Sequence, residues 1–162
     1  MPPTSTDPLE AMRREHREAL ELADRLEATA REGNEAALAE AVERVQRYNQ
    51  EEMEGHLQHE EQRILSVLAR EHPDHMPLCI RVGREHGQLR TLASGVGLDD
   101  PRRELAEFAA LLRAHTRMED EELFPLVGSL FTAAQQAAIL DFEPLPTRPV
   151  PVPGKGDGGM NT

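Results

Sequence analysis

Two histidine–glutamate pairs fall where amphipathic helices should bury apolar side chains. His115 and Glu119, within HTRMEDEELFP, occupy the inward positions that follow Phe108 and Leu112 at helical spacing. A buried carboxylate is costly unless it is paired or bound to a metal. Imidazole nitrogens and carboxylate oxygens at such positions therefore predict metal coordination inside the protein.

The other pair, His56 and Glu60, belongs to an internal match that extends beyond the pair itself. HLQHEEQRILSVL, from His56, aligns with HTRMEDEELFPLV, from His115, in the histidine, in acids four and five residues later, and in several later apolar positions. A spacing of four residues places both side chains of a pair on one helix face, about 40° apart. Glu60 and Glu119 are therefore predicted to point in the same direction as their histidines.

Two further helical stripes carry one inward histidine each. His16 follows Met12 on the first stripe, and His86 follows Val82 on the third. As purely structural residues, these histidines and acids would need compensating polar partners that the apolar stripes do not offer. We therefore predict one metal site with these ligands: His16, His56, Glu60, His86, His115 and Glu119.

The number and type of these ligands narrow the choice of metal. Four imidazoles and two carboxylates exceed what one tetrahedral zinc ion uses, and they suit two metal ions bridged by carboxylates. Mixed nitrogen and oxygen ligation on a helical bundle favours iron, with manganese or zinc as substitutes. Ferritin-like di-iron bundles use Glu-x-x-His on two helices, so a histidine-rich His-x-x-x-Glu site differs from that class.

The remaining histidines lie outside the apolar stripes. His59 is next to Glu60, whereas His72 and His75 flank Pro73. We interpret all three as surface or capping residues, and the sequence assigns no catalytic residue.

Four long amphipathic helices must position the ligand residues. Each is predicted to begin at a residue that can cap a helix and to end near a proline or glycine. They run from Asp7 to Gly33, from Asn34 to Pro73, from Asp74 to Gly95, and from Asp100 to an interruption at Pro125, and Thr132 with Gln135 begins a short fifth helix. No alternating strand pattern competes. The fold class is predicted as all-α, an antiparallel up-and-down four-helix bundle with a short C-terminal fifth helix.

The length of 162 residues suits one domain with a sizeable core. Residues 1–143 are predicted to form the bundle, and the Pro/Gly-rich residues 144–162 a disordered tail. Residues 123–140 form an uncharged run of membrane-spanning length, but Pro125, Gly128 and polar residues interrupt it. We interpret this run as two segments of a soluble domain.

Composition excludes several classes of partner. The net charge of −12 argues against nucleic acid, because phosphate binding needs clustered cations, and one tyrosine with four phenylalanines is too few aromatics for a base-stacking platform. Cys79 is the single cysteine, which rules out an internal disulfide and suits a reducing compartment. The first residues lack the apolar core of a secretory signal. We expect a cytoplasmic protein without nucleic-acid or membrane partners.

The combined motif resembles the hemerythrin-like family, the HHE cation-binding domain, over about residues 8–130. The resemblance rests on His16, on HLQHEE and HTRMEDEELFP, and on REHGQL, which contains His86. It implies a non-heme di-iron centre in a four-helix bundle, with an oxo or hydroxo bridge. It further implies that the four histidines are terminal ligands and that Glu60 and Glu119 bridge the irons.

Two positions bear on this resemblance. Asp120 is the alternative to Glu119, because oxygen-carrying hemerythrins have an aspartate five residues after the corresponding histidine. Those carriers also have a His-x-x-x-His pair on the third helix, and this chain has Val82 in place of the first histidine. Both irons would then have an open position, which favours reactive roles over reversible oxygen carriage.

Three functions follow as hypotheses from the resemblance. The leading one is a di-iron protein that binds or reacts with O2, NO or peroxide as a small ligand. The second is an iron donor or repair factor for damaged iron–sulfur clusters, a class with a similar ligand set. The third is a non-catalytic iron or oxygen sensor.

Overall fold

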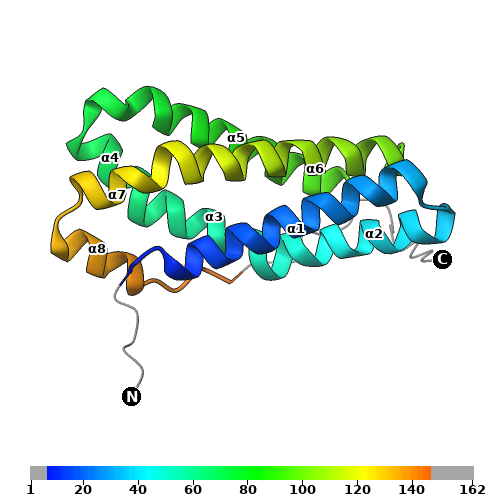
Figure 1. Ribbon diagram of the computed structural model, residues 1–162, viewed down its shortest axis with the longest axis horizontal. Helices are drawn as coiled ribbons and strands as arrows, with labels where there is room; N and C mark the ends of the chain where they lie inside the picture. The colour runs from blue at the N-terminus through cyan, green and yellow to red at the C-terminus, as the bar shows by residue number, and fades with distance from the viewer. Residues whose placement is uncertain (1–6, 147–162) are drawn as a thin grey trace, which may run out of the picture.

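The computed structural model describes residues 7–146, and this part of the chain contains helices and no strand. Figure 1 shows long helices packed lengthwise into an elongated bundle. The α-helices are α1 (Glu10–Glu32), α2 (Glu35–Tyr48), α3 (Glu54–Glu60), α4 (Ser66–Glu71), α5 (Met76–Gly95), α6 (Pro101–Met118), α7 (Phe124–Leu130) and α8 (Ala133–Leu140). The all-helical prediction is confirmed. None of these helices is long and apolar enough to cross a membrane.

Three predicted helix starts are confirmed by their capping hydrogen bonds. The Asn34 side chain accepts from the Ala37 amide, and the Asp100 side chain accepts from the Arg103 amide. Thr132 and Gln135 form a reciprocal capping box at the start of α8. These contacts satisfy amide donors that a helix start leaves unpaired.

Two predicted starts differ from the structure. The Asp7 side chain accepts from the Leu9 amide in a turn, and α1 begins only at Glu10. The prediction that Asp74 caps the third helix is wrong. Asp74 lies inside a 3₁₀ turn, η3 (Pro73–His75), and α5 begins after it with a proline in its first turn, where the missing amide proton costs little.

The second and fourth long helices contain π-helical turns that the sequence did not predict. The turns are η1 (Asn49–Met53), η2 (Glu61–Leu65) and η4 (Glu119–Leu123). The predicted interruption at Pro125 is wrong, because helical structure continues through α7 to Leu130. Pro125 falls in the first turn of α7, a position that tolerates proline. Such π-turns frequently occur at functional sites.

The buried interior consists of two apolar clusters with a polar layer between them. One cluster lies on one side of this layer. It includes Leu26, which comes after His16 in α1, and Phe108, which comes before His115 in α6. The other takes residues on the opposite side of the layer, such as Met12 in α1. The buried polar layer comprises His16, Glu60, His86, His115, Thr116 and Glu119. Apolar packing therefore covers the polar layer on two sides.

The short helix α8 is held against the second long helix by hydrogen bonds to its C-terminal carbonyls. The His59 ring donates to the Ile139 carbonyl at 2.6 Å, and the Arg63 guanidinium donates to the Ala138 carbonyl at 3.0 Å. Phe142 stacks on the half-buried His59 ring, with 4.7 Å between ring centroids. His59 thus has the capping role that the sequence allowed.

The predicted tail, residues 144–162, lies largely outside the described residues. Within them, the Leu145 amide donates to the Gln58 side chain at 3.0 Å. The chain therefore stays in contact with α3 just beyond the predicted domain boundary.

Candidate metal centre

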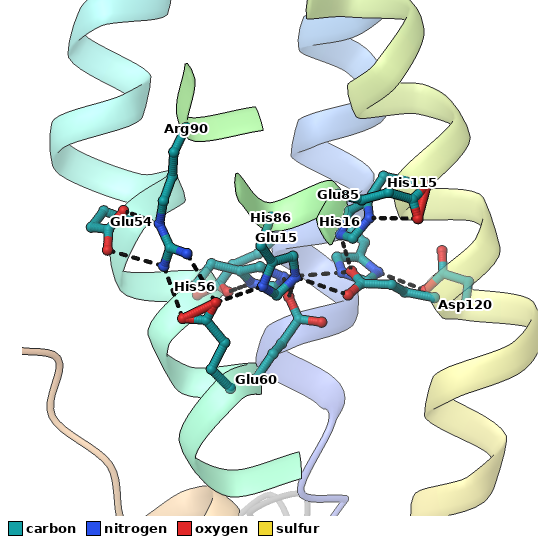
Figure 2. Close-up of polar contacts among 12 residues, drawn as sticks. Glu15, His16, Glu54, His56, Glu60, Glu85, His86, Arg90, His115 and Asp120 are labelled. Carbon is teal, nitrogen blue, oxygen red and sulfur yellow. Dashed lines mark hydrogen bonds and ion pairs between the residues drawn. The ribbon is translucent and has the colours of Figure 1, made fainter. Parts of the chain in front are cut away.

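Five of the six predicted ligand residues lie in the polar layer, and His56 lies at its edge. Figure 2 shows the four histidines converging from different helices. All of the six except His56 are exposed by 2% or less, and the His56 side chain is 12% exposed. Their donor atoms form two groups within 4.8 Å, one of His16, His56, Glu60 and Glu119 and one of His86, His115 and Glu119.

Glu119 is the residue common to both groups. Its Oε1 lies 3.3 Å from His16 Nε2 and 3.1 Å from His115 Nε2. Its Oε2 lies 3.3 Å from His86 Nε2. One carboxylate thus has an oxygen near histidines of each group, which is the placement that a bridging ligand requires.

Glu60 faces Glu119 across the layer. Its Oε1 lies 2.6 Å from His56 Nε2 and 4.0 Å from His86 Nε2. The His16 and His56 Nε2 atoms are 3.0 Å apart. All four imidazoles therefore present Nε2 to the two central carboxylates.

The opposite nitrogen, Nδ1, of each imidazole faces an outer carboxylate from another helix. His16 Nδ1 is 2.7 Å from Asp120, and His86 Nδ1 is 2.9 Å from Glu61. Such a carboxylate holds the Nδ1 proton, so that the Nε2 lone pair stays directed at the centre. Figure 2 shows Asp120 in this outer position beside His16.

The other two imidazoles repeat the arrangement. His56 Nδ1 contacts Glu15, and His115 Nδ1 lies 3.7 Å from Glu85. Sequence reasoning missed these outer carboxylates, although a signal exists. Each is the immediate sequence neighbour of an inward residue, as in Glu15–His16, Glu60–Glu61, Glu85–His86 and Glu119–Asp120.

The structure separates the two candidates for the bridging position. The Glu119 side chain is 1% exposed and lies among the Nε2 atoms, whereas the Asp120 side chain is 39% exposed and contacts only the Nδ1 side of His16. The two residues are adjacent on η4 and point to opposite sides of that ring. Glu119 therefore lies among the candidate donor atoms, whereas Asp120 lies outside them beside His16.

Arg90 stabilises one outer carboxylate. Its guanidinium donates to both oxygens of Glu61 at 2.9 Å and to both oxygens of Glu54 at 2.8 and 3.1 Å. Burial raises the pKa of Glu61, but His86 and Arg90 outweigh it and lower the pKa to about 2. Glu61 is therefore ionised at neutral pH and can accept a hydrogen bond from His86 Nδ1–H.

The inner groups have opposing pKa shifts. Burial and the nearby Glu60 carboxylate raise the pKa of Glu119 well above its usual value. Burial lowers the pKa of His115 to about 3, so this imidazole is neutral at physiological pH. Burial also lowers the pKa of His56, but Glu60 and Glu15 outweigh it and raise the pKa to about 10. A protonated His56 therefore neutralises part of the acidic centre when no metal is bound.

Several buried donor atoms fit a metal better than they fit one another. Within residues 7–146, Glu119 Oε1 and both His115 ring nitrogens make no hydrogen bond. Buried polar atoms without partners are rare in native proteins. Cations placed among them would supply the missing partner and offset the repulsion between the two carboxylates.

A cavity of about 480 Å³ reaches the layer from one side. Its wall includes His16, His56, His115 and Glu119, together with Tyr48. The segment after α8 contributes Phe142 and Pro144 to the same wall. A small molecule or ion therefore has a path to the donor atoms.

The sequence was compared with known families and proteins. Residues 7–127 match the family model described as the hemerythrin HHE cation binding domain. Neither the curated proteins nor the solved structures gave a significant match. The family match spans every element that contributes a residue to the polar layer.

Proposed function

The chain belongs to the hemerythrin family of HHE cation-binding domains, and from this we propose a non-heme di-iron protein that binds or reacts with O2, NO or peroxide. The observation that carries the proposal is the position of Glu119. Its two oxygens face histidines of both donor groups. Two separate groups joined by one carboxylate are what a two-metal centre needs, whereas a single ion would leave donors without a partner.

We infer the following roles for the chain's own residues. The four histidines would be terminal ligands, and Glu60 and Glu119 would connect the metal ions. Asp120, Glu15 and Glu61 would keep the Nδ1 protons of His16, His56 and His86, so that each of these Nε2 atoms remains a donor. The two apolar clusters cover the layer on two sides and so limit its contact with bulk water. Iron bound there supplies one-electron redox chemistry and exchangeable positions for a small ligand.

We also infer that the scaffold is an antiparallel up-and-down four-helix bundle. The support is the order of the long helices along the bundle axis in Figure 1, where α1, α2–α4, α5 and α6–α7 alternate in direction. The contacts of α1 with α6 and of α5 with α6 are consistent with it. This arrangement would make the two His-x-x-x-Glu helices parallel, in keeping with their matching sequences.

The absence of a second histidine on α5 supports a reactive role. Val82 lies one turn before His86 and is fully buried. Its side chain has no donor atom, so α5 contributes a single imidazole to the centre. The protein would then leave more positions open to a small ligand than a chain with a histidine there.

The test is metal analysis with an absorption spectrum of protein purified in air. We expect two irons per chain, one for each donor group, and near-UV absorption typical of a diferric centre. Azide, NO and peroxide should each change that spectrum. The variant Glu119→Gln keeps the side-chain shape but should lose both iron and absorption. About one metal ion or fewer per chain after anaerobic loading with Fe²⁺ would refute the two-metal proposal.

A further inference from the structure

The cavity that reaches the metal centre has an acidic outer rim. Glu18 in α1 and Glu51 and Glu52 in η1 line the cavity, and all three are exposed. They make no ion pair within the described residues, unlike Glu54, which pairs with Arg90. Three carboxylates without cationic partners therefore lie together at one opening.

The arginines near these three carboxylates are distributed unevenly between the cavity and a neighbouring groove. Of the residues that line the cavity, Arg14 is the single arginine. An adjoining groove shares Glu18, Glu51 and Glu52 but is also lined by Arg25, Arg44 and Arg47. Those arginines do not line the cavity that leads to the histidines. The electrostatic potential should therefore be more negative on the cavity side of the three carboxylates than on the groove side, and a cation should be attracted to the cavity side.

The inner end of the cavity carries donor atoms that lack partners. His115 Nε2 and Glu119 Oε1 are buried without a hydrogen bond, and both residues line the cavity wall. Their side chains are 3% and 1% exposed. The cavity thus joins an outer set of unpaired carboxylates to an inner set of unpartnered metal donors.

We infer that this cavity is the route by which divalent metal ions reach the centre, and that Glu18, Glu51 and Glu52 form its cation-attracting mouth. Exposed carboxylates raise the local concentration of a divalent cation, and this attraction acts over about 10 Å at 0.1 M salt. The three mouth residues have no role as final ligands, because they lie outside the polar layer. The inference rests on metal binding by the layer, and does not depend on which small molecule reacts there.

The experiment measures the rate at which metal-free protein takes up Co²⁺, whose visible absorption reports on ligation. The test variant is E18Q/E51Q/E52Q, and the matched control is E40Q/E43Q/E107Q, which removes the same charge at exposed positions away from the cavity. At about 10 mM ionic strength we expect the mouth variant to load roughly tenfold more slowly and the control less than about twofold. Both should reach the wild-type amount of bound Co²⁺, since no ligand residue is changed.

Salt dependence separates a charge effect from a blocked path. At about 0.5 M salt the difference between the mouth variant and the wild type should nearly vanish, because the charges are screened. Equal loading rates for the two variants at low salt would overturn the role of Glu18, Glu51 and Glu52 as a cation-attracting mouth. A slow rate that persists at high salt would overturn the electrostatic mouth. Wild-type protein that binds no Co²⁺ at any salt would instead refute the metal centre itself, and the route with it.

Discussion

Replacing Glu119 and Asp120 separately tests the division between inner ligand and outer support. The two acids are adjacent in η4, but Glu119 faces three Nε2 atoms at 3.1–3.3 Å and Asp120 faces His16 Nδ1 at 2.7 Å. Glu119→Gln removes the charge of the residue that both donor groups share. Asp120→Ala leaves all six inner residues in place and removes only the acceptor for one imidazole proton.

The expected magnitudes differ accordingly. Loss of an outer carboxylate typically weakens metal binding by about 10- to 100-fold, or roughly 1.4–2.7 kcal/mol. Asp120→Ala should therefore still bind metal at saturation, with weaker affinity. Glu119→Gln should bind neither ion after removal of free metal. Burial and Glu60 raise the pKa of Glu119, so its charge is unfavourable without metal, and the metal-free Glu119→Gln variant should melt no lower than the metal-free wild type.

Three measurements distinguish the variants. Elemental analysis after anaerobic loading gives stoichiometry, competition with a chromophoric chelator gives affinity, and calorimetry of both metal states gives the melting temperature. Glu121→Gln, at an exposed acid in the same helical turn, is the control for lost charge. If Asp120→Ala loses all metal while Glu119→Gln keeps two ions, the assignment of the two acids is reversed.

Three further outcomes are expected. His56→Ala should lose most bound iron, whereas His72→Ala, outside the polar layer, should keep it; elemental analysis showing equal loss would reject the ligand set. In the metal-free protein, burial lowers the pKa of His56 but Glu60 and Glu15 outweigh it and raise the pKa to about 10. The stabilisation from its proton is complete below about pH 6.5 and is lost as pH rises towards 10, so the free energy of unfolding in urea should fall by up to about 1.4 kcal/mol per pH unit between about pH 7 and 9; a rise over that range would contradict it. Val82→His should slow peroxide consumption at equal iron loading and lower the melting temperature, because Val82 is fully buried among apolar residues; unchanged peroxide consumption would show that Val82 does not face the centre.

The inward residues could be predicted because helical periodicity alone determines them. A residue's place on an apolar stripe depends on the 3.6-residue repeat and on nothing outside its own helix. His16, Glu60 and Glu119 therefore fall in the buried layer where the stripes placed them. The caps at Asn34 and Asp100 were predictable for the same reason, since each accepts from an amide three residues away.

The features that the sequence did not predict depend on contacts between helices or on competition between local alternatives. Asp74 and Asp100 have similar capping potential, but prolines on both sides of Asp74 favour a 3₁₀ turn there. The π-turn η4 departs from the 3.6-residue repeat beyond Glu119, and a uniform helical projection does not represent such a turn. The acidic mouth joins Glu18 and Glu51 from different helices, and their proximity depends on how α1 packs against η1.

The outer carboxylates show how the fold and the centre depend on each other. Glu15 in α1 supports His56 in α3, and Glu85 in α5 supports His115 in α6, so the pairs Glu15–His16 and Glu85–His86 act alike in the two halves. The acids that follow Glu60 and Glu119 have the same role, since Glu61 supports His86 and Asp120 supports His16. His16, His56 and His86 are thus each held from a helix other than their own, and Glu85 lies 3.7 Å from His115 Nδ1 without a hydrogen bond. Metal binding would fix all four helices at once, and because the metal binds only the folded arrangement, the loaded protein should melt well above the metal-free form.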